Sequence, residues 1–145
     1  MTTTEIKDFF KSIRREQLEI IHLAQMIHKE EAELLPRAIA YDRPKVQTSP
    51  EDHLAVSAAK INKLDSQLRT SIDILNKKRA RAEAMIIQLT DANEREVMRY
   101  YYLDTKNGRQ YSWSDVGDAM DMSLRTVFRI HGDALVNLTR SIDWQ

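Results

Sequence analysis

The 145-residue chain contains no cysteine, which excludes disulfide bonds, thiolate metal ligands and a thiol nucleophile together. It has only three glycines and three prolines, and every proline lies between residues 36 and 50, so long helices have room on both sides of that stretch. No segment approaches the roughly 18 consecutive apolar residues of a membrane helix, and the first ten residues lack the basic and apolar parts of a signal peptide. We therefore expect a cytoplasmic protein with no membrane partner.

An excess of charge of one sign is also missing, because 22 acidic residues balance 22 basic ones. A strongly basic chain would favour nucleic acid as a partner, and this composition does not. The charge is unevenly distributed, however. Residues 60–83 carry seven basic and three acidic side chains, whereas residues 91–145 carry seven basic and nine acidic ones.

Apolar residues recur at every seventh position before residue 90, which is typical of coiled-coil helices. The first series is Ile6, Ile13, Ile20, Ile27 and Leu34, alternating with Phe10, Gln17, Ala24 and Glu31. The second series is Leu54, Ile61, Leu68, Leu75, Ala82 and Leu89. These series predict one helix over about 4–35 and another from Pro50, capped by Ser49, to about 90.

Residues 1–89 are therefore expected to form a long antiparallel helical hairpin around a loop at 36–50, with Leu34 near Leu54 and Ile6 near Ala82. The heptads do not decide whether the helices pair within one chain or between two chains. We interpret the region as a homodimerisation element, because two such stripes are more apolar than one hairpin needs. The loop either holds a partner or packs across the hairpin.

Residues 90–145 show the capping signals of three further helices. Asp91, with Glu94 three positions later, predicts a helix to about Leu103, which the polar turn around Asn107-Gly108 follows. Ser112 is expected to cap a short helix, and Ser123 to cap a last, longer one. A short helix, a tight turn and a longer helix predict a helix-turn-helix, so the fold class is all-α.

The last helix has two different faces at helical spacing. We expect the inward face to consist of Val127, Ile130, Ala134 and Leu138. We expect the outward face to consist of Leu124, Arg125, Phe128 and Arg129, with Thr126 beside them. The short helix is expected to pack on the core through Val116, Ala119 and Met120. Residues 122–132 contain two arginines, one histidine and no acid, so the outward surface is locally positive.

The run EREVMRYYYLDTKNGRQYSWSDVGDAMDMSLRTVFRIHGDALVNL resembles the promoter-reading region 4 of sigma-70-type factors. It also resembles the related module of phage transcription regulators of the ArpU and RinA type, in which a segment similar to YDRPKVQTSPED precedes the paired helices. The resemblance covers most of the chain from Tyr41 onward. It implies a phage or prophage activator of late, packaging or lysis genes, acting in the cytoplasm of a bacterial host cell. Asp115-Val116-Gly117 departs from the Glu-Ile-Ala that is usual in the family.

Carried over to this chain, the resemblance implies a set of residues that bind double-stranded DNA. The base-reading candidates are Leu124, Arg125, Thr126 and Arg129, since arginine bonds guanine and threonine touches the thymine methyl group. The candidates at helix N-termini, where phosphates bind, are Ser112, Trp113 and Ser123. Further phosphate candidates are Lys106, Arg109 and His131.

Other functions find little support in the sequence. Glu19 and His22 have the spacing of a metal-binding pair, but no second such pair exists to complete a site. We expect no enzyme, cofactor or metal site. The alternative to DNA binding is a module of the same shape that binds host RNA polymerase or another protein, which the net neutrality and Phe128 favour.

Overall fold

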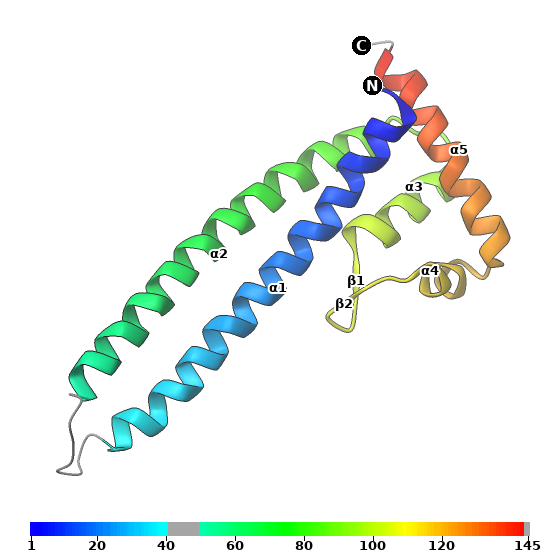
Figure 1. Cartoon of the computed structure of the whole chain (residues 1–145). Coiled ribbons are helices and arrows are strands. Elements are labelled where there is room, and N and C mark those ends of the chain that lie inside the picture. Colours follow the sequence, from blue (N-terminus) through cyan, green and yellow to red (C-terminus); the bar gives the residue numbers. More distant parts are fainter. Residues whose placement is uncertain (41–49, 144–145) are drawn as a thin grey trace. The chain divides into compact units, whose positions relative to one another are not determined.

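The computed structural model describes residues 1–40 and 50–143, and their side chains over 1–34 and 52–141. It confirms the all-α prediction (Figure 1). The elements are α1 (Thr3–Ala40), α2 (Pro50–Ile86), α3 (Ala92–Met98), a π-helical segment η1 (Arg99–Leu103), β1 (Thr105–Lys106), β2 (Arg109–Gln110), α4 (Trp113–Met120) and α5 (Leu124–Asp143).

The long helices begin and end close to their predicted limits. α1 continues through Pro36 to Ala40, five residues beyond the expected end. α2 begins at Pro50 as predicted and ends at Ile86, slightly before the expected end. The predicted cap Ser49 and most of the loop at 36–50 lie outside the described residues.

The chain divides into two compact units. Unit 1 combines Met1–Glu16 with the part of the chain from Leu75 onward, and unit 2 spans Gln17–Ile74. This division differs from the boundary expected between residues 89 and 90. The first four turns of α1 and the end of α2 belong with the C-terminal helices.

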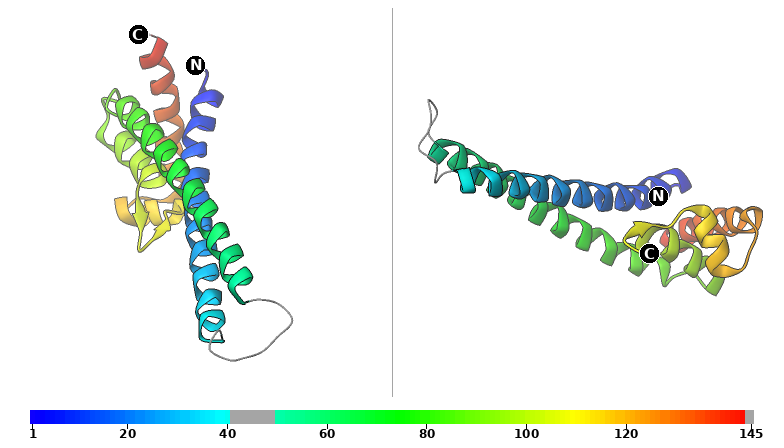
Figure 2. Two further views of the ribbon diagram at one scale, coloured as in Figure 1. Left: turned by 90° about the vertical axis from the view of Figure 1, so that its left-hand side faces the viewer. Right: turned by 90° about the horizontal axis from the view of Figure 1, so that it is seen from below.

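The main core of unit 1 joins α1 to the C-terminal helices. Ile6, Phe10 and Ile13 are fully buried, and the Phe10 and Tyr102 ring centroids lie 5.1 Å apart. The first turns of α1 lie beside the last turns of α5 in Figures 1 and 2, and the hydroxyl groups of Thr3 and Thr139 are 3.3 Å apart. The other buried members of this core are Ala82, Met85, Ile86, Leu89, Met98, Leu103, Ala134, Leu135 and Leu138.

A smaller core holds the C-terminal helices together. Its four buried residues are Val97, Val116, Val127 and Ile130. Partly buried side chains surround them, among them Tyr100, Tyr101, Tyr111, Trp113, Met120 and Met122. η1 connects the two cores, since Tyr102 packs in the first and Tyr101 borders both.

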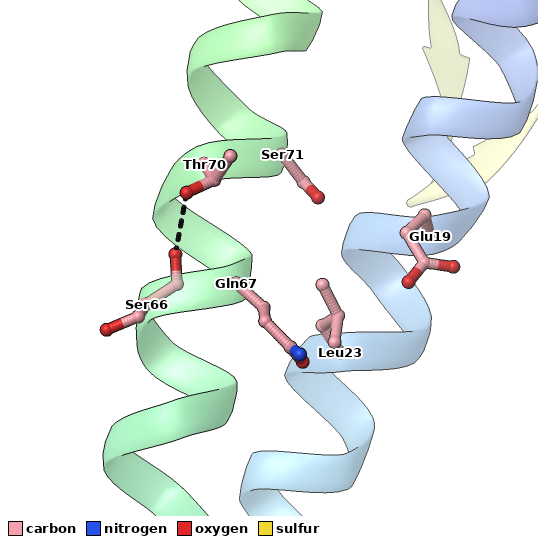
Figure 3. A pocket seen from close by; sticks show the side chains of 6 residues that line it. All are labelled: Glu19, Leu23, Ser66, Gln67, Thr70 and Ser71. Carbon is pink, nitrogen blue, oxygen red and sulfur yellow. Dashed lines mark hydrogen bonds between the residues drawn. The ribbon is translucent and has the colours of Figure 1, made fainter.

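Unit 2 consists of two antiparallel helical segments from α1 and α2. Lys60 Nζ lies 3.9 Å from a carboxylate oxygen of Glu30. Leu23 is buried, whereas Ala24, expected in the heptad seam, is exposed. A shallow recess of about 400 Å³ separates Glu19 and Leu23 on α1 from four polar side chains on α2 (Figure 3). These are Ser66, Gln67, Thr70 and Ser71, and the Thr70 hydroxyl donates to the Ser66 carbonyl.

No helix in the described ranges is both long and apolar enough to span a bilayer. Within the same ranges, no group of three or more histidine, aspartate or glutamate side chains is placed to hold a metal ion.

The contribution of α1 to the core of unit 1 can be tested with Phe10→Ala. Because Phe10 is fully buried, we expect a loss of about 3–5 kcal/mol in the free energy of unfolding, measured by urea denaturation. Phe128→Ala is the matched control, since this phenylalanine is 50% exposed and should cost about 1 kcal/mol. Equal losses in the two variants would contradict the role of α1.

Candidate nucleic-acid interface

The helix-turn-helix rests on α3, whose start and contacts are well defined. The Asp91 carboxylate accepts hydrogen bonds from the backbone amides of Asn93 and Glu94, which confirms Asp91 as the cap. Glu94 does not complete a capping box. Its carboxylate instead accepts from Nδ2 of Asn137, at 2.7 and 3.1 Å, and burial raises its pKa. This pair fixes the second half of α5 against α3.

η1 leads from α3 into a short β-hairpin. The amide of Asp104 donates to the carbonyl of Arg99, five residues earlier, which gives one π-helical turn. At the hairpin, Asn107 and Gly108 have φ angles of 52° and 78°. Two successive positive φ angles are typical of a type I′ turn, and Asn-Gly is its favoured sequence. The predicted polar turn is therefore the end of a hairpin between β1 and β2.

α4 begins with a complete capping box. The Ser112 hydroxyl accepts from the Asp115 amide at 3.1 Å, and the Asp115 carboxylate accepts from the Ser112 amide at 2.9 Å. The hydrogen bond from the Ser112 amide, with a smaller effect from the Ser112 side chain, lowers the pKa of Asp115, and Lys106 Nζ lies 3.6 Å from its carboxylate. The predicted cap is confirmed. The start of α4 already carries a carboxylate and a paired lysine, which weakens the case for Ser112 and Lys106 as phosphate ligands.

Gly117 sets the tight turn between α4 and α5. Its carbonyl accepts from the amide of Met122 at 2.9 Å, and Asp121 adopts a left-handed conformation with φ of 54°. A Cβ atom on Gly117 would lie only 2.8 Å from the Met122 carbonyl oxygen. This close approach leaves no room for a larger residue at this position unless the turn shifts.

α5 begins after Ser123, whose hydroxyl accepts from the amide of Thr126 at 3.2 Å, as predicted. The same hydroxyl lies 2.9 Å from the Thr126 Oγ1 atom, and Thr126 is half-buried. The start of α5 is thus held by its own side chains.

The two faces of α5 are those predicted from helical spacing. Val127, Ile130, Ala134 and Leu138 are buried. Leu124, Arg125, Phe128 and Arg129 are exposed. On α4, Val116 is buried as expected and Met120 is half-buried, but Ala119 is exposed and Gly117 takes its place in the interior. The helix-turn-helix therefore presents two arginines at the start of α5.

His131 is a correction to the predicted set. Its side chain is only 7% exposed, and its Nε2 atom lies 2.8 Å from the Tyr102 hydroxyl. Burial, with a smaller effect from Lys7 and Lys11, lowers the pKa of His131 to about 4. The imidazole is neutral near pH 7 and cannot supply charge to a phosphate. The positive charge that residues 122–132 contribute to the outward surface therefore comes from Arg125 and Arg129.

Trp113 is held by packing. Its ring stacks on Tyr101, with centroids 3.6 Å apart and planes within 10°. The Arg14 guanidinium lies over the Tyr101 ring, 3.8 Å from its centroid. It donates hydrogen bonds to the backbone carbonyls of Tyr101 and Tyr111. The rings of Trp113 and Phe128 form a T-shaped contact, with centroids 5.4 Å apart, and Trp113 is partly exposed. Of the other predicted residues, Arg109 is exposed on β2.

Sequence reasoning missed the residues that α1 places beside this surface. Arg14 holds Tyr101, and Lys7 and Lys11 line a recess with Phe128 of α5. The only signal in the sequence is that these basic residues flank the apolar positions Ile6, Phe10 and Ile13. That pattern gives no information about which partner they face.

Comparison with known proteins agrees with this geometry. The model of the family Sigma-70, region 4, matches residues 85–140, which is less than half of the chain. Region 4 is a DNA-binding helix-turn-helix region of sigma-type regulators, so the match supports a region 4-like helix-turn-helix from the end of α2 to the last turns of α5. No curated protein and no solved structure matches the chain.

Alanine should have opposite effects on stability at Gly117, beside the turn, and at Gly132, within α5. Gly117→Ala should lower the free energy of unfolding by about 1–3 kcal/mol, because the new methyl group meets the Met122 carbonyl. Gly132→Ala should raise it by about 0.5–1 kcal/mol, because no atom lies within 4 Å and alanine favours the helix. Both are measurable by urea denaturation. Stabilisation by Gly117→Ala would show that the turn is not tightly packed.

Proposed function

We propose that this protein is a sequence-specific regulator of transcription that binds double-stranded DNA through α5. The observation that carries the proposal is the pair Arg125 and Arg129, exposed on α5 while the opposite face of the helix is buried. A helix held in this way fits the major groove, where arginine bonds O6 and N7 of guanine. Leu124 and Thr126 are the neighbouring base-contact candidates, and Arg109 and Ser123 are the phosphate candidates.

The biological setting is a further part of the proposal. The resemblance to phage regulators of the ArpU and RinA type supports an activator of late, packaging or lysis genes. Such a protein works in the cytoplasm of a bacterial host cell. Host RNA polymerase is then a second partner, and the exposed Phe128 is a candidate contact for it.

The experiment for DNA reading is selection of duplexes from a random pool by the full-length chain, followed by affinity measurements. Arg125→Ala and Arg129→Ala should each cost about 1–3 kcal/mol of binding free energy and relax the preference at one base pair. Arg69→Ala, which removes an exposed arginine of unit 2, is the matched control and should leave the preference unchanged. The proposal fails if both α5 variants retain the wild-type preference.

A salt titration separates DNA binding from the alternative, a module that binds only protein. The affinity of a DNA-binding protein falls steeply with salt, because phosphate contacts release counterions. A protein-binding module would retain no selected duplex at moderate ionic strength.

We also propose that the protein is a homodimer through unit 2. Six large apolar side chains in the described part of this unit are between 37% and 57% exposed, namely Leu18, Ile21, Met26, Val56, Ile72 and Ile74. A two-helix unit leaves such side chains uncovered, and a second copy would bury them. A dimer would present two copies of α5 to half-sites about one DNA turn apart.

Light scattering should therefore give a mass of twice the 16.9 kDa of one chain. Ile21→Glu combined with Ile72→Glu should reduce the mass to that of a single chain, because a charge cannot be buried at an apolar contact without large cost. A monomeric wild-type protein at working concentration would remove the dimer from the proposal.

A further inference from the structure

A recess of about 310 Å³ lies beside the exposed face of α5 in unit 1. Lys7 and Lys11 of α1 line one part of it, and Trp113 of α4 and Phe128 of α5 line another. Tyr102 and His131 also line it, and since both are buried they form its bottom. The recess therefore lies where α1 meets the start of α4 and the outward face of α5.

The recess is positively charged. Lys7 and Lys11 are four residues apart and so lie one above the other on α1. No acidic side chain lines the recess, and none of the ion pairs found among the described residues involves either lysine. The ammonium groups are close enough to lower the pKa of His131. Two cations without a carboxylate partner favour an anion as the occupant.

The position of the recess relates it to DNA. Phe128 lies one turn after Arg125 on the outward face of α5, and Trp113 is the first residue of α4. In a helix-turn-helix the second helix enters the major groove while the first helix crosses the sugar-phosphate backbone. A backbone strand that passes the start of α4 next to α5 would thus run along the recess.

We propose that this recess binds a phosphate of the duplex backbone, neutralised by Lys7 and Lys11, while the apolar edges of Trp113 and Phe128 contact the adjacent sugar. The inference rests on the proposed DNA-binding function. It goes beyond that function because α1 lies outside the residues that match the family model. The first helix would then add to affinity without adding base preference, since phosphate contacts carry no direct sequence information.

The test uses the full-length chain and a duplex selected from a random pool by the wild-type protein. The double variant Lys7→Gln/Lys11→Gln should weaken binding equally for preferred and unrelated duplexes. It should also reduce the slope of log affinity against log salt by about 1 for each lysine. Lys7→Arg/Lys11→Arg should keep the wild-type slope, because charge is retained. Lys29→Gln/Lys63→Gln, which removes two exposed lysines of unit 2, should also keep it.

Replacement of single phosphates by uncharged methylphosphonates identifies the contact. At the phosphate bound in the recess, the methylphosphonate should weaken DNA binding by the wild-type protein. It should not weaken DNA binding by the glutamine variant any further. Thermal unfolding of that variant should match the wild type, because both lysines are exposed.

An unchanged salt slope in the glutamine variant, with base preference still lost in Arg125→Ala, would overturn the phosphate recess and leave the proposed function in place. A loss of affinity in the glutamine variant that occurs only with certain base pairs in the duplex would also overturn the phosphate recess, since the lysines would then read bases. Failure to select any duplex would overturn both proposals.

Discussion

The packing of Ile6, Phe10 and Ile13 against the C-terminal helices is the interaction on which the rest of the structure depends. The smaller core, which holds the helix-turn-helix together, has only four buried residues, which is little for a domain of this size. Burial of three large side chains contributes about 1.5–3 kcal/mol each, an amount comparable to the whole stability of a small protein. This packing holds the second half of α5 and the smaller core holds the first half, so the outward face of the helix presents Arg125 and Arg129.

The features predicted correctly from the sequence are those decided within a few residues. Ser112, Ser123 and Asp91 cap the helices that they precede, because a cap bonds amides only two or three positions away. Asn107 and Gly108 form the turn for a similarly local reason, namely their tolerance of positive φ angles. Helical spacing also gave the inward and outward faces of α5, since one face of a long amphipathic helix must be covered.

The features that were missed depend on contacts between distant parts of the chain. A heptad stripe tells which side of α1 is apolar but not what covers it, so the packing of Phe10 on Tyr102 could not be foreseen. The burial of His131 is not visible in the sequence, because its buried partner, Tyr102, is 29 residues earlier. In unit 2, Leu23 is buried and Ala24 is exposed, although a strict heptad places Ala24 in the seam.

The single π-helical turn at η1 makes the length of this segment a constraint in itself. One residue of an α-helix corresponds to a rotation of about 100°. Removing a residue between Arg99 and Leu103 would restore ordinary helical hydrogen bonding, and it would swing everything downstream around the helix axis by that angle. Tyr102 could then no longer pack in the main core while Tyr101 borders both cores. Insertions and deletions should therefore be tolerated at the Asn107-Gly108 hairpin tip, where the chain is exposed, and rejected within η1, which ends at Leu103.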